Sequence, residues 1–475
     1  MVNMIVNISE VKMVKLSTQH TLSTLLLMFA IFLSGCSNKF NTESHSDKLN
    51  HLSDRVDLVL NSSSDILEYT PGVFLLDELI DVPELSEFIQ VALLENPELQ
   101  QSIQALKITQ LQSKVVNSQR EPTANLNFIG SKTENETSNS YLTEFTVSWE
   151  LDLLGKLADQ GNAAKLDIAS EEQSVAQVRN LLVSNIMRAW LDITLQKLQL
   201  DIEYARLANQ KKVVNLIASR YSAGLDSLES LDNARARFFT TQANIENQSQ
   251  QKYMAKQALA AFGGVFRQGI TIDEEKLFFP LVIEPTTILS IQHIYERPDV
   301  KIGLLSIEAE ALRTNAAHKA LLPSFSISAS LNDSGSSPIE SLLTDPVWKL
   351  LGQLSAPLFQ GGRLQAEAKS AELRLAQQVW KYQDTLLKAV REVETSIANE
   401  KRLLAQIQYL TNAINSAQRS YTSFIEKYQQ GLVDIFDLLN TQEQTFDLQI
   451  QLIQTKHNQL TNRINLGLAL GLGVH

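Results

Sequence analysis

The sequence is poor in the residues on which several kinds of site depend. It contains 1 cysteine, Cys36, in 475 residues, which excludes a disulfide framework, a cysteine-rich zinc site and a cysteine-ligated iron–sulfur cluster. Its 41 Lys and Arg against 53 Asp and Glu give a net charge of −12, with no block of basic residues, so we expect no nucleic acid partner. The histidines are scattered, with no pair four residues apart and no carboxylate partner, and neither a phosphate-binding glycine loop nor a nucleophile elbow occurs. We therefore expect no metal and no cofactor.

Long hydrophobic runs are also scarce. The main one, residues 25–33, follows Lys12 and Lys15 and is too short to span a bilayer, which is typical of a signal peptide. It leads into Leu33-Ser34-Gly35-Cys36, which resembles the lipobox of bacterial lipoproteins, where the cysteine becomes a lipidated N-terminus. The alternative is that Cys36 is an ordinary buried residue, but a polar stretch follows it. Removing residues 1–35, whether translation starts at Met1 or Met13, leaves an exported chain with a net charge of −13.

Proline is missing from two long stretches, 123–279 and 358–475, although the chain has 11 prolines. Because proline breaks helix interiors, both stretches are predicted to be long helices. Apolar residues recur there at steps of three and four, from Ile186 to Tyr221 and from Leu404 to Tyr428, as in a coiled-coil seam. Gly224 and Gly431 occupy turn-like sites inside the stretches, so each is predicted to be a helical hairpin with a first arm about 100 Å long.

The chain contains an internal repeat. A shift of 207 residues superimposes Gly155 on Gly362 and Gly224 on Gly431, and a shift of 201 superimposes Pro97 on Pro298. The six-residue difference indicates an insertion between these anchors. A repeat of this length predicts a duplicated unit rather than two unrelated domains.

Two pairs of alternating segments precede the helical hairpins. Residues 141–151 and 348–357 place apolar residues on one face and Glu, Ser, Thr, Lys or Gln on the other, and residues 124–128 and 324–331 alternate likewise. We expect two β-hairpins that span a membrane, although a soluble, half-buried sheet alternates equally well. Trp149 and Trp348, placed near the helix-side ends of equivalent strands, are candidates for an interfacial aromatic girdle, or else pack between strands.

Four strands cannot form a closed barrel in a membrane, because open edges in lipid leave backbone groups without partners. The chain is therefore expected to oligomerise. Two copies would give eight strands around an interior filled by side chains, and three would give twelve strands around a water-filled lumen.

Several motifs together resemble the TolC-type outer-membrane efflux proteins, in particular their lipoprotein branch, from about residue 83 to the end. The motifs are Arg297-Pro298-Asp299, Leu322-Pro323-Ser324-Phe325-Ser326, Pro357-Leu358-Phe359-Gln360-Gly361-Gly362-Arg363, Trp149-Glu150-Leu151-Asp152-Leu153-Leu154-Gly155-Lys156, two Tyr-x-x-Gly-Leu turns and Ala469-Leu470-Gly471-Leu472-Gly473. The resemblance implies a mainly α homotrimer with a membrane β part: a twelve-stranded outer-membrane β-barrel continuous with a periplasmic α-helical barrel. It also implies a periplasmic adaptor and an inner-membrane pump as partners, contact with outer-membrane lipid, and a channel that is no enzyme.

With this resemblance the chain divides into five segments. Residues 1–35 are the signal peptide, and 36–95 hold the lipidated segment and equatorial elements, a belt around the tunnel. The first repeat, 96–263, has a β-hairpin at 123–152 and a helical hairpin at 155–262. An inter-repeat equatorial linker covers 264–297. The second repeat, 298–475, has a β-hairpin at 324–357 and a helical hairpin at 362–470.

The resemblance also places a gate after the second helical turn. Asp437 matches the first acidic gate position of the family and Asn440 the second, where Asp is common; Asp434 lies one turn earlier. Three copies would place three Asp437 carboxylates around one axis and attract cations. Asp434 and Asp437 also fit a solvated helix start, where the dipole stabilises carboxylates. The two turns are the expected adaptor contact, which is compatible with simple helix termination; its residues are Gly224, Leu225, Gly431 and Leu432.

Three other readings remain at this point. A periplasmic lipoprotein adaptor or coiled-coil scaffold would also be exported, but the family of adaptors has one helical hairpin between β-rich halves. A lipoprotein enzyme is opposed only by the absence of a catalytic motif. An outer-membrane duct of a protein-secretion system shares every feature above, because the pump selects the cargo.

Overall fold

The computed structural model describes residues 75–80, 82–132, 139–264, 277–280, 282 and 291–474. These residues all belong to one compact unit, Arg55–His475. The predicted signal peptide and Cys36 lie outside the described residues. Within the described residues, no helix is both long and apolar enough to cross a membrane.

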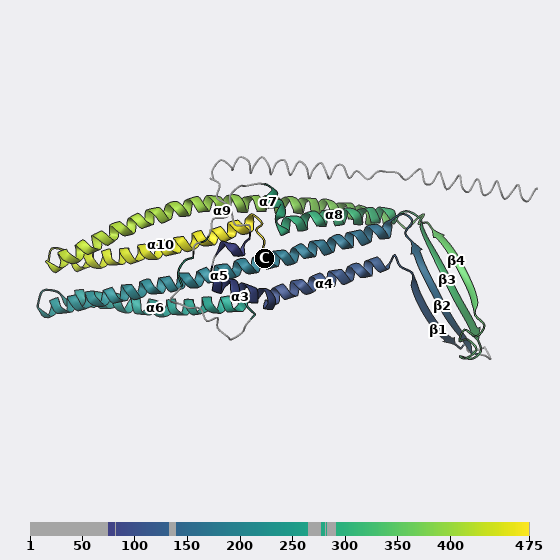
Figure 1. Cartoon of the computed structure of the whole chain (residues 1–475), viewed down its shortest axis with the longest axis horizontal. Coiled ribbons are helices and arrows are strands. Elements are labelled where there is room, and N and C mark those ends of the chain that lie inside the picture. Colours follow the sequence, from purple (N-terminus) through teal and green to yellow (C-terminus); the bar gives the residue numbers. More distant parts are fainter. Residues whose placement is uncertain are drawn as a thin grey trace, which may run out of the picture. The chain divides into compact units, whose positions relative to one another are not determined.

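The structure contains the same order of elements twice. A short η1 (Asp77–Leu79) and α3 (Pro83–Glu95) precede the first copy, which consists of α4 (Pro97–Ser118), β1 (Thr123–Ser131), β2 (Ser140–Leu151), α5 (Lys156–Ser222) and α6 (Leu228–Phe262). After α7 (Ile291–Glu296), the second copy consists of α8 (Pro298–Lys319), β3 (Ser324–Gly335), β4 (Val347–Ser355), α9 (Arg363–Gln429) and α10 (Ile435–Ala469). Figure 1 shows the hairpin turns and the strands at opposite ends of the long helices.

The two copies match closely in length, which confirms the predicted duplicated unit. Helices α4 and α8 have 22 residues each, α5 and α9 have 67, and α6 and α10 have 35. The bounds of α4 and α8 differ by 201 residues and those of the long helices by 207. The six additional residues of the second copy therefore lie within its β-hairpin region.

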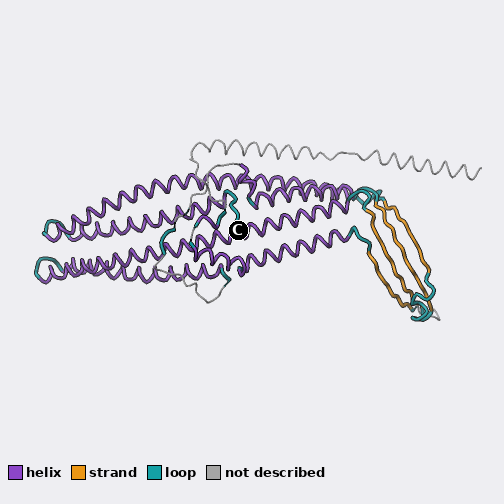
Figure 2. Tube along the Cα trace, viewed as in Figure 1, coloured by secondary structure: helices purple, strands orange, loops and turns teal. Residues whose placement is uncertain are grey.

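The strands form one antiparallel sheet in the order β1-β2-β3-β4, which Figure 2 shows as a single group of strands. The central pairing joins the two repeats, with Phe145 opposite Leu331 and Trp149 opposite Ile327. Strands β1 and β4 form the edges, and every residue of both is exposed. The sheet is thus a single surface with two edges available for pairing.

The register sorts the side chains of the sheet into an apolar and a polar face, because residues opposite each other share a face. The apolar face carries the following side chains: Leu126, Phe128, Phe145, Val147, Trp149, Phe325, Ile327, Leu331, Trp348, Leu350 and Leu354. The other face carries Asn125, Asn127, Glu144, Thr146, Ser148, Ser326, Ser328, Ser330, Lys349 and Gln353, and also the apolar Ile129, Leu142, Val347 and Leu351. The predicted alternation is therefore present in all four strands.

The two tryptophans of the apolar face lie toward opposite ends of the sheet, one near the helices and one far from them, contrary to the sequence-based prediction. Trp149 is the third residue from the helix-side end of β2, and its Nε1 donates a hydrogen bond to Arg120 O (2.8 Å). Trp348 is the second residue of β4, at the end far from α9, and pairs with Leu331. The prediction failed because the two segments were aligned without the insertion that separates their registers.

Each long hairpin is joined end to end with the shorter helix of its own repeat. In the first repeat Asn96 Nδ2 donates to Phe262 O, the last residue of α6 (2.9 Å). In the second repeat Arg297 Nη1 donates to Ala469 O, the last residue of α10 (3.0 Å). These carbonyls lack a partner within their helix, so both bonds satisfy groups that would otherwise stay free. The duplication thus extends to the contacts that hold the helices in line.

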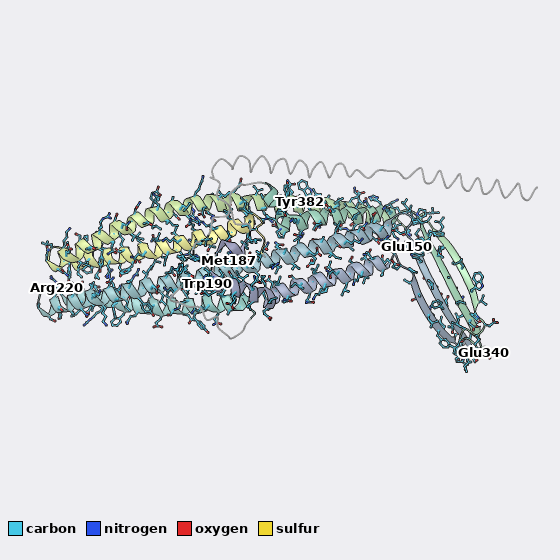
Figure 3. The ribbon with its side chains drawn as sticks, viewed as in Figure 1. Glu150, Met187, Trp190, Arg220, Glu340 and Tyr382 are labelled. Carbon is cyan, nitrogen blue, oxygen red and sulfur yellow. The ribbon has the colours of Figure 1, made fainter. Side chains whose placement is uncertain are left out.

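The main apolar core lies midway along α5, where Met187 and Trp190 are labelled in Figure 3. It combines residues of η1, α3, α5, α6 and α10, among them Leu79, Leu85, Ile186, Leu259 and Ile464. A second cluster near the hairpin turns includes Val213, Ile217, Leu231, Tyr421, Tyr428, Ile435 and Leu438.

The predicted coiled-coil seams are only partly buried. Tyr204 is 51% exposed and Tyr221 42%, although both follow the apolar spacing of α5. Leu404 is 47% exposed, while the neighbouring Leu403 is buried. Between the two apolar clusters, α5 instead buries polar side chains such as Arg206 and Gln210. The spacing of apolar residues did not predict burial there, because polar contacts with α10 determine which face of α5 is buried.

Candidate functional site

The two hairpin tips, residues 222–227 and 429–434, have the same backbone geometry. Gly224 and Gly431 adopt positive φ angles of 73° and 72°, which favour glycine. Leu225 N donates to Arg220 O and Leu432 N to Lys427 O, both at 2.9 Å, which closes the two helix ends alike. Leu225 is 65% exposed and Leu432 67%. Each tip therefore presents an apolar side chain to its surroundings.

The three candidate gate residues begin α10 and differ in their contacts. Asp434 is the N-cap, and its Oδ1 accepts a hydrogen bond from Phe436 N (2.7 Å), as expected for a helix start. Asp437 is exposed in the first turn. Asn440 is exposed one turn later, and its Oδ1 accepts a hydrogen bond from Arg237 Nη2 of α6 (3.1 Å). Asp434 thus caps the start of α10, as the alternative to a gate role predicted. Asn440 links the two repeats through Arg237.

A polar cluster at the tips ties the second repeat to the first. Asp226 Oδ2 accepts hydrogen bonds from Tyr428 Oη (2.5 Å) and from Arg220 Nε (3.0 Å). The Arg220 guanidinium also lies 4.9 Å from the centre of the Tyr428 ring, and Figure 3 labels Arg220 at the hairpin end. Tyr428 lies in the last turn of α9, whereas the other two residues belong to the first hairpin. The cluster therefore connects hairpins that are 200 residues apart in sequence.

The protonation of this cluster follows from its contacts. Burial alone would raise the pKa of Asp226, but the hydrogen bonds from Tyr428 and Arg220 outweigh it and lower that pKa below its ordinary value. Burial, and then the Asp226 carboxylate, raise the pKa of Tyr428. Asp226 therefore stays ionised and Tyr428 stays a donor at neutral pH. The sequence does not reveal the cluster, because nothing in the turns around Gly224 and Gly431 indicates that they meet.

A second polar contact between the repeats lies along α5 and α10. Arg206 of α5 pairs with Asp447 (Nη2 to Oδ1, 2.7 Å) and Glu443 (Nη1 to Oε2, 3.3 Å) of α10, and Gln210 Nε2 donates to Glu443 Oε1 (3.0 Å). Glu203 lies 3.7 Å from Arg206 and is 7% exposed. Burial raises the pKa of Glu203, Arg206 lowers it, and the neighbouring acids raise it further, so the net shift is upward. One guanidinium here faces three carboxylates.

The prediction that histidines lack carboxylate partners is wrong. His457 Nε2 of α10 lies 2.8 Å from Asp192 Oδ1 of α5, and His318 Nε2 of α8 lies 3.2 Å from Glu372 Oε1 of α9. Sequence alone could not pair them, because each pair joins different helices. In the part of the chain that the structure describes, no three His, Cys, Asp or Glu side chains are grouped to hold a metal ion.

Relatives with known names match most of the chain. A probable outer membrane lipoprotein, SilC of Salmonella typhimurium, is 26% identical over 403 residues, 82% of this chain and 86% of SilC. The cation efflux system protein CusC of Escherichia coli K12 is 25% identical over 82% of this chain and 87% of CusC. The pyoverdine export outer membrane protein OpmQ of Pseudomonas aeruginosa is 24% identical over 82% of this chain and 85% of OpmQ.

Solved structures share the fold. A crystal structure of CusC superimposes with a TM-score of 0.77 at 24% identity, covering 85% of this chain and 95% of that one. The outer membrane protein VceC of Vibrio cholerae gives 0.75 at 23% identity, covering 82% and 97%. The family model of the outer membrane efflux proteins matches residues 88–265 and 291–472, which is most of the chain. The chain therefore belongs to the outer membrane efflux protein family.

Proposed function

We propose that three copies of this chain form the exit channel of a tripartite efflux system. The observation that carries the proposal is the four-stranded sheet, which has an apolar face, a polar face and two exposed edge strands. Three such sheets give twelve strands, enough for a closed barrel around a water-filled lumen. The apolar face then meets lipid and the polar face lines the lumen. The channel is a passive duct and catalyses no reaction.

The exposed edges support contact between copies. In the half nearer the sheet, contacts run from α4 to α5, from α5 to α8 and from α8 to α9, so α4 and α9 are the outermost helices. Helix α9 exposes Leu373 (62%), Trp380 (66%) and Leu387 (60%) at seven-residue intervals, and α4 exposes Ile108, Leu111 and Val115. Such apolar stripes on both outer helices can pack against a second copy of the chain. Each large apolar side chain that becomes buried there stabilises the association by about 1.5–3 kcal/mol.

The tips and their neighbours account for the remaining parts of the proposal. Leu225 and Leu432, with Gly224 and Gly431, are the proposed contact with the periplasmic adaptor, which links the channel to an inner-membrane pump. Asp437 lines the aperture, where three carboxylates around one axis attract cations and repel one another. Asn440 and Arg237 border it. Lipid on Cys36 anchors the chain in the outer membrane.

The cargo is small. Two of the named relatives carry a cargo in their names: CusC is a cation efflux system protein, and OpmQ is a pyoverdine export protein. CusC and OpmQ therefore differ in cargo, although both match 82% of this chain. We propose that this channel passes small molecules or ions that its pump selects, rather than proteins.

Cross-linking between the edge strands tests the shared barrel. Asn125 of β1 is combined with Lys349, Leu351, Gln353 or Ser355 of β4, each changed to Cys in a Cys36→Ser chain. Within one chain β1 and β4 are separated by β2 and β3, so a disulfide can form only between copies. We expect at least one pair to give cross-linked trimers, and reconstituted protein to conduct ions in planar bilayers. Monomers for all pairs, without conductance, would overturn the proposal.

A further inference from the structure

The loops that connect strands to the long helices expose large apolar side chains. In the loop between β4 and α9, Leu358 is 88% exposed and Phe359 89%. In the loop between β2 and α5, Leu153 is 72% exposed and Leu154 40%. Side chains of this size and exposure, paired in both repeats, indicate a surface that is covered in the working protein.

The duplication shows that Phe359 replaces a helix cap. Asp152 lies 207 residues earlier, at the equivalent position, where its two carboxylate oxygens accept hydrogen bonds from Leu157 N (3.1 Å) and Ala158 N (2.6 Å). The N-cap residues themselves are glycines in both helices, Gly155 and Gly362, and contribute no side-chain cap, so Asp152 supplies this contact for α5, and Phe359 has no side-chain acceptor to supply it for α9. Losing such a cap costs about 1 kcal/mol. The second repeat thus lacks a stabilising contact and exposes a phenyl ring instead, which is explained if the ring is buried against something else.

The location of these loops favours lipid over a second copy as the covering material. Both loops continue from the helix-side ends of strands whose apolar face carries Trp149. The Leu153-Leu154 loop follows β2, a central strand, so it lies away from the sheet edges where copies meet. A covering that reaches both a central strand and an edge strand fits a continuous lipid surface.

The charges beside the loops agree with a lipid surface. A cation occurs at each of the four junctions between strand and helix: Arg120, Lys156, Lys319 and Arg363. Three of them also pair within the chain, Lys156 with Glu150, Lys319 with Asp159 and Arg363 with Glu367, at 2.6–2.8 Å. Long basic side chains at the level of the headgroups can reach phosphates while their stems pack on apolar surface.

We propose that the loops at 152–155 and 357–362 form a collar that inserts into the periplasmic leaflet of the outer membrane, with Leu153, Leu154, Leu358 and Phe359 among the acyl chains. The four junction cations face the lipid phosphates. The collar fixes the depth at which the helices leave the membrane. The inference rests on the proposed membrane-spanning barrel but goes beyond it, since the collar lies outside the strands.

The test measures the surroundings of single nitroxide labels in full-length Cys36→Ser protein. Labels at Phe359→Cys, Leu350→Cys and Phe239→Cys are compared in vesicles of phosphatidylethanolamine and phosphatidylglycerol. Leu350 lies on the apolar face of β4, and Phe239 lies on α6, 62% exposed. We expect residues 350 and 359 to collide with oxygen more than with a water-soluble nickel complex, and residue 239 to show the reverse.

The outcomes separate the collar from the barrel. If residue 350 is in lipid while 359 meets the nickel complex, or is shielded from both reagents by a second copy, the collar is refuted and the barrel stands. If residue 350 also meets the nickel complex, the proposed barrel itself fails. Phe359→Asp, which restores the cap, should lower the membrane-inserted yield several-fold, whereas Gln360→Asp should not; equal yields would also refute the collar.

Discussion

The hydrogen bond from Tyr428 to Asp226 joins the two tips, and deleting a single oxygen atom is enough to break it. Tyr428 is 2% exposed, and the Asp226 side chain is 13% exposed, so water screens the bond little. A hydrogen bond to a charged group contributes roughly 1.5–3 kcal/mol, which corresponds to about a 10-fold to 150-fold shift in an equilibrium. Tyr428→Phe keeps the ring in its apolar cluster and removes only the hydroxyl. We expect it to shift the tips toward separation by a factor in this range.

Two assays measure the separation: single-channel current in planar bilayers and susceptibility of cells to a large antibiotic such as vancomycin. Tyr421→Phe is the matched control, because it keeps the ring in the same apolar cluster and removes a hydroxyl that accepts its hydrogen bond from Gln442 of the same repeat (3.2 Å). The control should lower stability without raising current or leak. If both variants behave alike, or Tyr428→Phe leaves current and leak unchanged, the reasoning about the tip contact is refuted.

Three further predictions concern other residues. Asp437→Ala should raise conductance and antibiotic leak, and unchanged values would remove Asp437 from the aperture. Burial raises the pKa of Glu203 in the folded state above its value in the unfolded chain. The protonated side chain therefore contributes stability at low pH, and this stability is lost as the pH rises through the folded-state pKa. Glu203→Gln should therefore raise Tm more at about pH 8 than at about pH 5, and an equal change at both would contradict the assignment. Cys36→Ser should abolish labelling with radioactive palmitate, whereas persistent labelling would place the lipid elsewhere.

The sequence predicted those parts of the fold that depend on local patterns. Proline positions, the turns at Gly224 and Gly431 and the two shifts were enough for the duplicated unit, because each reflects a backbone requirement of the chain itself. The alternating segments gave the two faces of the sheet for the same reason. The position of Trp348 was predicted wrongly, because the sequence does not show where within the β-hairpin region of the second repeat the six additional residues lie.

Contacts between distant helices could not be predicted. Asp226 and Tyr428 meet because two separate hairpins lie side by side, and neither residue stands out within its own turn. Arg206 is buried against the spacing of apolar residues, because two acids of α10 compensate its charge. The pairing of His457 with Asp192 escaped notice in the same way. Such contacts depend on tertiary packing, which propensity and periodicity do not contain.

The claim that copies of this chain share one channel is tested most directly by counting them. The full-length protein is extracted from membranes in mild detergent, and the mass of protein per particle is measured by light scattering combined with absorbance and refractive index. We expect three copies per particle, that is, three times the mass of one mature chain, residues 36–475. A stable monomer in every detergent would contradict it, because a single four-stranded sheet cannot close a barrel in lipid.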